Sequence, residues 1–193
     1  MAAKSKSKFD PKNMQALVSA ERRRAIDTHS LLSRVPIRSH HVVADIGCGP
    51  GYFTIPLAKH LYNGKVYALD VQQEMLDATQ KTLEDARLTN VEVTLSKERK
   101  LPLDDESLDG ALMAFVLQEA DGPEALLREA RRCLKRAGWL AVLEWHKHET
   151  EQGPPIERRI DPDEMQAMAE KLELKVKETQ ELNPDQYMML MRK

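Results

Sequence analysis

The feature that most constrains the fold of this chain is a glycine-rich loop between a strand-like run and a helix-like run. The stretch VVADIGCGPGYFTIPLA, residues 42–58, places glycine at positions 47, 49 and 51. Where a parallel strand ends and a helix begins, unpaired backbone N–H groups face a crevice in which ligands bind. Glycine lets the backbone turn sharply there and lets a ligand approach without a Cβ in the way. The loop therefore predicts a nucleotide-like ligand.

Strand-like and helix-like segments alternate along the chain from residue 42 onward. The expected strands are 42–46, 65–70, 91–95, 108–115, 139–145, 174–179 and 186–192. The expected helices are 51–61, 72–87, 123–135 and 161–172. This alternation predicts an α/β fold with a Rossmann-like, doubly wound sheet of seven strands. The sheet should be mostly parallel, and its last two strands are close enough in sequence to form an antiparallel pair.

The segment before the first expected strand has its own amphipathic pattern. Leu17, Ala20, Arg24 and Thr28 recur at helical spacing, which predicts one helix over residues 13–33. We expect residues 1–33 to form a tail and a lid helix, and residues 34–193 to form one globular domain. A helix lying over the carboxyl ends of the strands would exclude water and complete an acceptor pocket.

Composition excludes several classes of protein. The charges are nearly balanced, with 29 Lys plus Arg against 31 Asp plus Glu, and they are spread along the chain rather than gathered in a basic stripe. We therefore expect no nucleic-acid partner. The two cysteines, Cys48 and Cys133, have no metal-type spacing, and so few cysteines fit a reducing cytoplasm. No stretch approaches the ~20 apolar residues of a membrane span, so we expect a cytoplasmic protein.

Two acidic residues narrow the identity of the nucleotide-like ligand. A nicotinamide fingerprint, G-x-G-x-x-G, would need glycine at position 52, where this chain has Tyr52. Asp45 precedes the loop, where its charge would oppose a pyrophosphate but attract the ammonium of an amino-acid ligand. That sign favours S-adenosylmethionine. Asp70 ends the next strand, where a carboxylate accepts ribose hydroxyl protons in either cofactor class.

Four successive motifs resemble those of class I S-adenosylmethionine-dependent methyltransferases. They are VVADIGCGPGYFTIPLA, KVYALD, LPLDDESLDGALMAFVLQE and LKRAGWLAVLEW, which together span residues 42–145. Within the class, the chain is most similar to the ubiquinone/menaquinone C-methyltransferase-like (type 11) group and to small prokaryotic relatives. The resemblance implies a seven-stranded sheet with a reversed last strand, and it implies S-adenosylmethionine as cofactor with S-adenosylhomocysteine as product.

The resemblance also implies roles for residues of this chain around the cofactor. Asp45 should orient the amino group, Asp70 should hold the ribose hydroxyls, and Val71 and Met75 should flank the adenine. The remaining expected cofactor residues are Gly47, Cys48, Gly49 and Gly51 in the loop, Glu98, Ala114 and Phe115. The chain departs from the family at Ser96, Lys97 and Glu98, where many relatives carry Gly-Asp-Ala. Glu98 or a backbone group should then take over the adenine contact.

The chemistry of methyl transfer asks little of the protein. A sulfonium methyl is already electrophilic, so in-line alignment and exclusion of water carry much of the rate. A general base is needed only when the acceptor must lose a proton. The candidates for that role lie at or just beyond the carboxyl ends of expected strands: Gln118, Glu119, Glu144, His146 and His148. We expect no metal site, because His146 and His148 have no evident third ligand.

Missing motifs narrow the acceptor. No Asn-Pro-Pro-Tyr element follows the fourth expected strand, and no Pro-Cys nucleophile is present, so base methylation of nucleic acid is disfavoured. We therefore expect a small-molecule acceptor. The triple arginine at residues 22–24 is typical of a solvated helix face, but it could also contact an anionic acceptor. A cofactor-binding regulatory or scaffold module without turnover stays open, as does, more weakly, an NAD-dependent oxidoreductase. The sequence leaves open whether the protein is a monomer or a homodimer.

Overall fold

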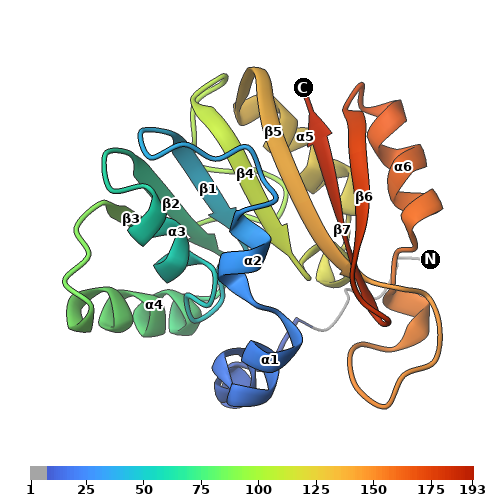
Figure 1. Cartoon of the computed structure of the whole chain (residues 1–193), viewed down its shortest axis with the longest axis horizontal. Coiled ribbons are helices and arrows are strands. Elements are labelled where there is room, and N and C mark those ends of the chain that lie inside the picture. Colours follow the sequence, from blue (N-terminus) through green and yellow to red (C-terminus); the bar gives the residue numbers. More distant parts are fainter. Residues whose placement is uncertain (1–7) are drawn as a thin grey trace.

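The computed structural model describes residues 8–193 and contains one seven-stranded sheet in the order β3-β2-β1-β4-β5-β7-β6 (Figure 1). The pairs among β1 to β5 are parallel, whereas β7 runs antiparallel to both β5 and β6. The order reverses between β1 and β4, which creates the crevice at which open α/β sheets bind ligands. This confirms the predicted fold class. The strands are β1 Val42–Ile46, β2 Lys65–Asp70, β3 Val91–Leu95, β4 Leu108–Ala114, β5 Leu134–Trp145, β6 Lys175–Asn183 and β7 Gln186–Arg192.

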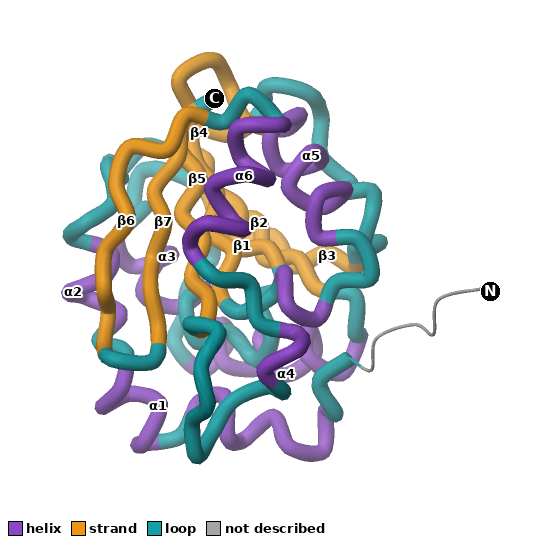
Figure 2. Tube along the Cα trace, turned by 90° about the vertical axis from the view of Figure 1, so that its right-hand side faces the viewer, coloured by secondary structure: helices purple, strands orange, loops and turns teal. Residues whose placement is uncertain are grey.

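Helices cover both faces of the sheet. Helices α5 (Pro123–Cys133) and α6 (Pro162–Lys171) pack on one face, and α2 (Thr28–Leu32), α3 (Thr54–His60) and α4 (Gln73–Asp85) pack on the other (Figure 2). The remaining helical elements are short: η1 Pro11–Val18, α1 Ala20–Ala25, η2 Leu117–Glu119 and η3 Ile156–Arg158.

The face under α5 and α6 is built from the helical periodicity visible in the sequence. Leu126, Leu127, Ala130 and Cys133 of α5 are buried against the sheet. Helix α6 begins at Asp161, whose side chain accepts a hydrogen bond from the backbone N–H of Glu164 at 2.9 Å. Asp161 is therefore the N-cap of α6 and Pro162 its first helical residue, in agreement with the helix expected over residues 161–172.

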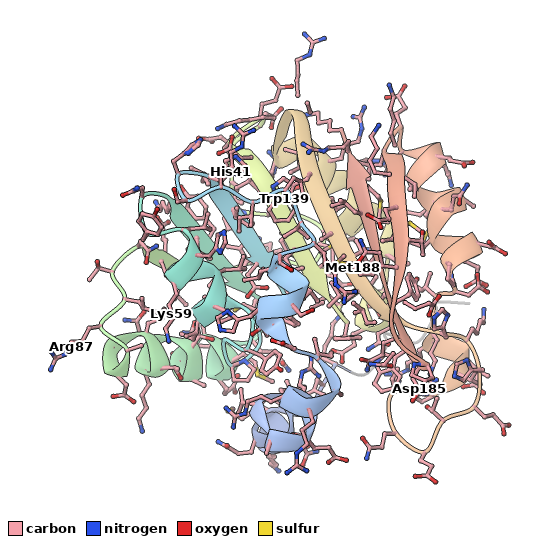
Figure 3. The ribbon with its side chains drawn as sticks, viewed as in Figure 1. His41, Lys59, Arg87, Trp139, Asp185 and Met188 are labelled. Atoms are coloured by element: carbon pink, nitrogen blue, oxygen red, sulfur yellow. The ribbon has the colours of Figure 1, made fainter. Side chains whose placement is uncertain are left out.

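The opposite face takes part of its cover from the amino-terminal region. Leu31 and Leu32 of α2 are buried in the same cluster as Leu57 of α3 and two residues of the sheet, Trp139 and Met188 (Figure 3). A buried leucine contributes about 1.5–3 kcal/mol to folding. The end of the amino-terminal region is therefore part of the core.

The single helix predicted over residues 13–33 is wrong, because the chain breaks it twice. Ser19 is extended and caps α1, accepting a hydrogen bond from the backbone N–H of Arg22 at 3.1 Å. Ile26 is extended as well, and Asp27 caps α2 through the N–H of His29 at 2.9 Å. Short polar residues that cap a helix also interrupt a longer one, because they offer the backbone an alternative partner. Residues 1–7 of the predicted tail lie outside the described residues.

Two predicted boundaries move for identifiable reasons. Strand β4 ends at Ala114 rather than at Phe115, because Phe115 has a left-handed backbone with a φ of 63°. Strand β5 begins at Leu134 rather than at Trp139, because Leu134 already pairs with Leu108 of β4. Helix α5 accordingly ends at Cys133.

Within residues 8–193, none of the helices combines the length and the apolar character needed to span a bilayer.

Candidate functional site

The glycine loop after β1 is tied to the end of β2. The backbone N–H groups of Gly47 and Cys48 both donate to the carbonyl of Leu69, at 2.7 and 2.9 Å. Gly47, Gly49 and Gly51 all have positive φ, at 73°, 54° and 87°. Other residues adopt this conformation only at a cost in free energy. The loop conformation therefore requires the glycines that the sequence supplies.

Gly47 is the most restricted of the three. A Cβ at this position would lie 2.4 Å from Cγ2 of Val116, which follows β4. We expect Gly47→Ala to lower the free energy of unfolding by about 1–3 kcal/mol and to weaken ligand binding in the crevice, because it adds a clash to a strained φ. Urea unfolding measures the first effect. Gly122→Ala is the matched control, since Gly122 has a φ of −143° and its Cβ would meet a flexible arginine side chain. Equal free energies of unfolding for Gly47→Ala and Gly122→Ala would contradict the expected clash with Val116.

A cavity of about 460 Å³ opens at the carboxyl ends of the strands. Figure 1 shows α1 below the sheet, next to the edge at which β1 and β4 end. Most of the predicted cofactor residues line this cavity: Gly47, Cys48, Gly49, Asp70, Val71, Met75, Glu98, Ala114 and Phe115. Gly51 lies beside α4 instead, where a Cβ would stand 3.2 Å from Oγ1 of Thr79. The fold thus brings together residues from four separate stretches of the chain, at or after the ends of β1, β2, β3 and β4.

Asp70 is held in place at the wall of the cavity. Its two carboxylate oxygens accept hydrogen bonds from the backbone N–H groups of Gly49, at 2.9 Å, and Gln72, at 3.0 Å. Burial raises the pKa of Asp70, while these bonds oppose the rise. Each oxygen of a carboxylate can accept a further hydrogen bond. Asp70 can therefore receive two hydroxyl donors from a ligand without losing its present partners.

Asp45 is placed differently from its predicted role. Its side chain is 1% exposed and accepts a hydrogen bond of 2.6 Å from the hydroxyl of Thr54, and it is not among the described residues that line the cavity. Burial raises the pKa of Asp45 to about 7, and the Thr54 hydroxyl opposes that rise. Contact with the ammonium of a ligand stays a prediction.

The raised pKa of Asp45 has a consequence for stability. In the unfolded chain an aspartate titrates near pH ~4, so between pH ~4 and 7 the folded protein binds more protons. The free energy of unfolding should therefore fall as the pH rises through this window. Asp45→Asn removes this contribution, on the order of 2–3 kcal/mol between pH ~5 and 8. Urea unfolding across that range should show that the free energy of unfolding falls less with pH in Asp45→Asn than in the unmodified protein. An equal fall in both proteins would contradict the raised pKa of Asp45.

Two of the five candidate bases line the cavity. Gln118 is 4% exposed, and its amide nitrogen donates to the carbonyl of Phe115 at 3.3 Å. Glu119 lies beside it and accepts a hydrogen bond of 3.1 Å from the backbone N–H of Phe9. Burial raises the pKa of Glu119.

The other three candidates are elsewhere. Glu144 is fully buried and accepts a hydrogen bond of 2.9 Å from the backbone N–H of Leu117, which joins β5 to η2. Nε2 of His146 lies 2.6 Å from Glu181, and Nε2 of His148 lies 3.1 Å from Asp185 in the turn between β6 and β7 (Figure 3). None of the three is among the described residues of the cavity wall. Their predicted part in proton transfer is not supported by this geometry.

Several wall residues were given no site role by the sequence: Lys8 and Phe9 of the amino-terminal segment, and Tyr52 and Trp145 at the other end of the cavity. Leu17 and Arg22, from the segment expected to cover the strand ends, line the cavity as well. Lys8 pairs with Glu98 at 2.6 Å, and the carbonyl of Phe9 accepts from Gln72 at 3.0 Å. No signal in the sequence places Lys8 or Phe9 there. The break at Ser19 is the signal that could have shown Arg22, rather than Arg24, turning inward.

One buried arginine organises the loop that closes the cavity beside β5. Arg159 is 4% exposed, and its guanidinium lies over the ring of Trp145 at 5.1 Å. All three of its nitrogens donate to oxygens of the loop 146–155. The acceptors are the carbonyls of Pro154 (3.0 Å), His146 (3.2 Å), His148 (2.7 Å) and Gln152 (3.2 Å), and the hydroxyl of Thr150 (2.6 Å). Gly153, Pro154 and Pro155 of this loop reach the cavity wall.

Comparison with known proteins shows where this architecture recurs. A crystal structure of a SAM-dependent methyltransferase from Aquifex aeolicus is 32% identical, with a TM-score of 0.91 over 96% of this chain and 99% of that chain. The demethylmenaquinone methyltransferase of Bacillus subtilis (strain 168) is 30% identical over 52% of this chain and 43% of the relative. The mitochondrial 2-methoxy-6-polyprenyl-1,4-benzoquinol methylase of Caenorhabditis elegans is 31% identical over 52% of this chain and 36% of the relative. The chain thus spans less than half the length of these two curated relatives.

The family match covers the elements that build the cavity. Residues 44–142, about half of the chain, match the family described as "Methyltransferase domain". The match runs from β1 through the glycine loop, Asp70 and Phe115 into β5. The chain therefore belongs to the methyltransferase domain family and has the fold of class I S-adenosylmethionine-dependent methyltransferases.

Proposed function

We propose that this protein transfers a methyl group from S-adenosylmethionine to a small-molecule acceptor. The observation that carries the proposal is one continuous cavity with two chemically different ends. One end lies over β1 and β2 and contains the glycine loop and Asp70. The other lies over β4 and β5 and contains Phe115 and Trp145. A transferase needs both ends, because donor and acceptor must meet in one space that excludes water.

The residues of the first end fit the proposed cofactor. The positive-φ glycines form a cradle that a Cβ would fill at Gly47, and Asp70 has lone pairs for two ribose hydroxyls. Met75, 2% exposed, and Val71 supply apolar surface beside Asp70 for an adenine ring. Glu98, placed by Lys8, stands at the same end for a polar contact. When bound, S-adenosylmethionine supplies a methyl group already activated by its sulfonium.

The residues of the second end would position the acceptor. Phe115 and Trp145 have ring centroids 6.1 Å apart, and Tyr52 and Phe53 stand at the start of α3 beside them. Such rings hold a flat apolar molecule and exclude water. Gln118 carries an amide and cannot take up a proton, so Glu119, which lies toward the first end beside Phe9, is the candidate base for an acceptor that must lose one.

Two further observations bear on the acceptor and on the alternatives. The curated relatives named above carry names that refer to demethylmenaquinone and to a polyprenyl benzoquinol, which supports a ring compound as acceptor. An NAD-dependent oxidoreductase is disfavoured by Tyr52 at the position of the third fingerprint glycine. A regulatory module without turnover would not need the second, aromatic end of the cavity.

A methyl-transfer screen tests the proposal. The full chain is incubated with S-adenosylmethionine labelled in the methyl group and with separate sets of thiols, phenols, quinols and amines. We expect label to enter at least one set, in an amount that exceeds the enzyme and grows with time. Cofactor binding without label in any set would instead support the regulatory module.

A further inference from the structure

We infer that Arg22 holds an anionic group of the methyl acceptor, so that the acceptor is a small aromatic acid. This inference rests on the proposed function and deepens it by naming the substrate class. It follows from the position of Arg22 in the cavity wall, from the lack of an ion pair with it among residues 8–193, and from the rings that surround it.

Arg22 is turned into the second end of the cavity by the break at Ser19. Its guanidinium carbon lies 5.0 Å from the ring centroid of Phe115 and 5.3 Å from that of Tyr52. Its neighbours Arg23 and Arg24 are exposed to solvent. Stacking against rings fixes the plane of a guanidinium and leaves its N–H edge free to bind. The geometry is that of a receptor for a planar oxyanion.

The charge of Arg22 is not balanced by an ion pair within the described part of the chain. Among residues 8–193, no carboxylate forms an ion pair with it, and its Nε is buried without a hydrogen-bond partner. The preceding residue, Glu21, accepts a hydrogen bond of 2.8 Å from Gln152 instead. Burial lowers the pKa of Arg22. A buried cation without a partner costs free energy, which a bound anion recovers.

The acidic residues of the wall have other partners at the opposite end. Asp70 accepts from Gly49 and Gln72, and Glu119 accepts from Phe9. Glu98 is paired with Lys8. These acids suit the hydroxyl and amino groups of a nucleoside, whereas Arg22 suits an acid. Lys8 and Lys97 line the same end as these acids, so that end carries both signs of charge, whereas Arg22 lies beside Tyr52 and Phe115.

The rings around Arg22 set the shape of the acceptor. Tyr52, Phe115 and Trp145 all line this end of the cavity. Because the cavity of about 460 Å³ must hold both cofactor and acceptor, the acceptor is small. A ring between aromatic side chains, with a carboxylate or similar oxyanion toward the guanidinium, satisfies both the shape and the charge.

The test compares aromatic acids with neutral partners of the same shape. The probes are benzoate, 4-hydroxybenzoate and 3,4-dihydroxybenzoate, each paired with its carboxamide. Binding to the full chain is measured by calorimetry with and without saturating S-adenosylhomocysteine. The variant is Arg22→Gln, and the matched control is Arg23→Gln, which changes an exposed neighbour in the same helix. At least one acid should bind at least tenfold more tightly than its amide, and Arg22→Gln alone should abolish that preference.

A second arm separates the acceptor's anion from the carboxylate of the cofactor. 5′-Methylthioadenosine lacks the amino-acid part of S-adenosylhomocysteine. If Arg22 serves the acceptor, Arg22→Gln should change the affinities for both nucleosides less than threefold. Loss of S-adenosylhomocysteine binding alone would assign Arg22 to the cofactor and overturn the inference, and so would the absence of any acid preference in the unmodified protein. Failure of the protein to bind S-adenosylhomocysteine at all would instead remove the proposed function, whatever the acids do.

Discussion

Asp70→Asn should weaken binding of S-adenosylhomocysteine roughly 10- to 150-fold, about 1.5–3 kcal/mol. The carboxylate is fixed by the backbone N–H groups of Gly49 and Gln72, so its remaining lone pairs are already oriented toward the cavity. Charge-assisted hydrogen bonds to two ribose hydroxyls are among the stronger ones that a ligand can form. The amide of asparagine has the same shape but only one acceptor oxygen.

The measurement is a calorimetric titration of both proteins, with thermal unfolding as a check that the variant folds. Asp77→Asn is the matched control, because Asp77 is an exposed acid on α4, the helix that follows Asp70. The affinity of Asp77→Asn for S-adenosylhomocysteine should stay within about twofold of that of the unmodified protein. An unchanged affinity in Asp70→Asn would mean that this carboxylate only supports the backbone of the loops.

Arg159→Ala should lower the free energy of unfolding by about 2–4 kcal/mol and abolish methyl transfer. Its guanidinium satisfies four backbone carbonyls and one hydroxyl of the loop 146–155, which would lose their donor together. The loop carries Gly153 to Pro155 into the cavity wall. Cofactor binding should persist, since the loop lies at the end of the cavity opposite Asp70.

Arg159→Lys refines this test, because an ammonium has the charge but not the planar fork of donors. Arg159→Lys should recover only part of the free energy of unfolding that Arg159→Ala loses. Arg136→Ala, at an exposed arginine in β5, should leave the urea midpoint unchanged. Proteolysis of the loop 146–155 provides an independent measure. If Arg159→Ala leaves both the urea midpoint and the cleavage rate of the loop unchanged, the loop holds its conformation without this side chain.

The sheet could be predicted from the sequence because its signals are local. Short runs such as VVADI and KVYALD bury nearly all their side chains, so their composition reveals strands directly. The glycine loop was equally visible, because positive φ at Gly47 and Gly49 leaves glycine as the favoured residue.

The amino-terminal region shows where local signals failed. The amphipathic pattern through Leu17, Ala20 and Arg24 suggested a continuous helix, yet the caps at Ser19 and Asp27 divide it. Contacts across more than a hundred residues, such as Phe9 with Glu119, depend on the folded sheet and leave no mark in a short window. For this reason the sequence could not show which arginine of the triple faces the cavity.

The sequence also could not show which of the two acids near the strand ends lines the cavity. Asp45 and Asp70 both lie near the ends of buried strands, and both were expected to contact the ligand. Asp70 lines the cavity, whereas Asp45 bonds to Thr54 and its contact with a ligand stays a prediction. Alternation along a strand shows which face of the sheet a residue occupies. It does not show whether a ligand or, as at Asp45, a hydroxyl from the first turn of α3 lies against the side chain.

Titration of the full chain with S-adenosylmethionine, S-adenosylhomocysteine and NAD tests whether the cavity is an S-adenosylmethionine site. Both S-adenosyl compounds should bind with dissociation constants on the order of micromolar, about −8 kcal/mol, with one site per chain. NAD should show no comparable binding, because Tyr52 replaces the third glycine of a dinucleotide fingerprint. Tighter binding of NAD than of either S-adenosyl compound would contradict the account.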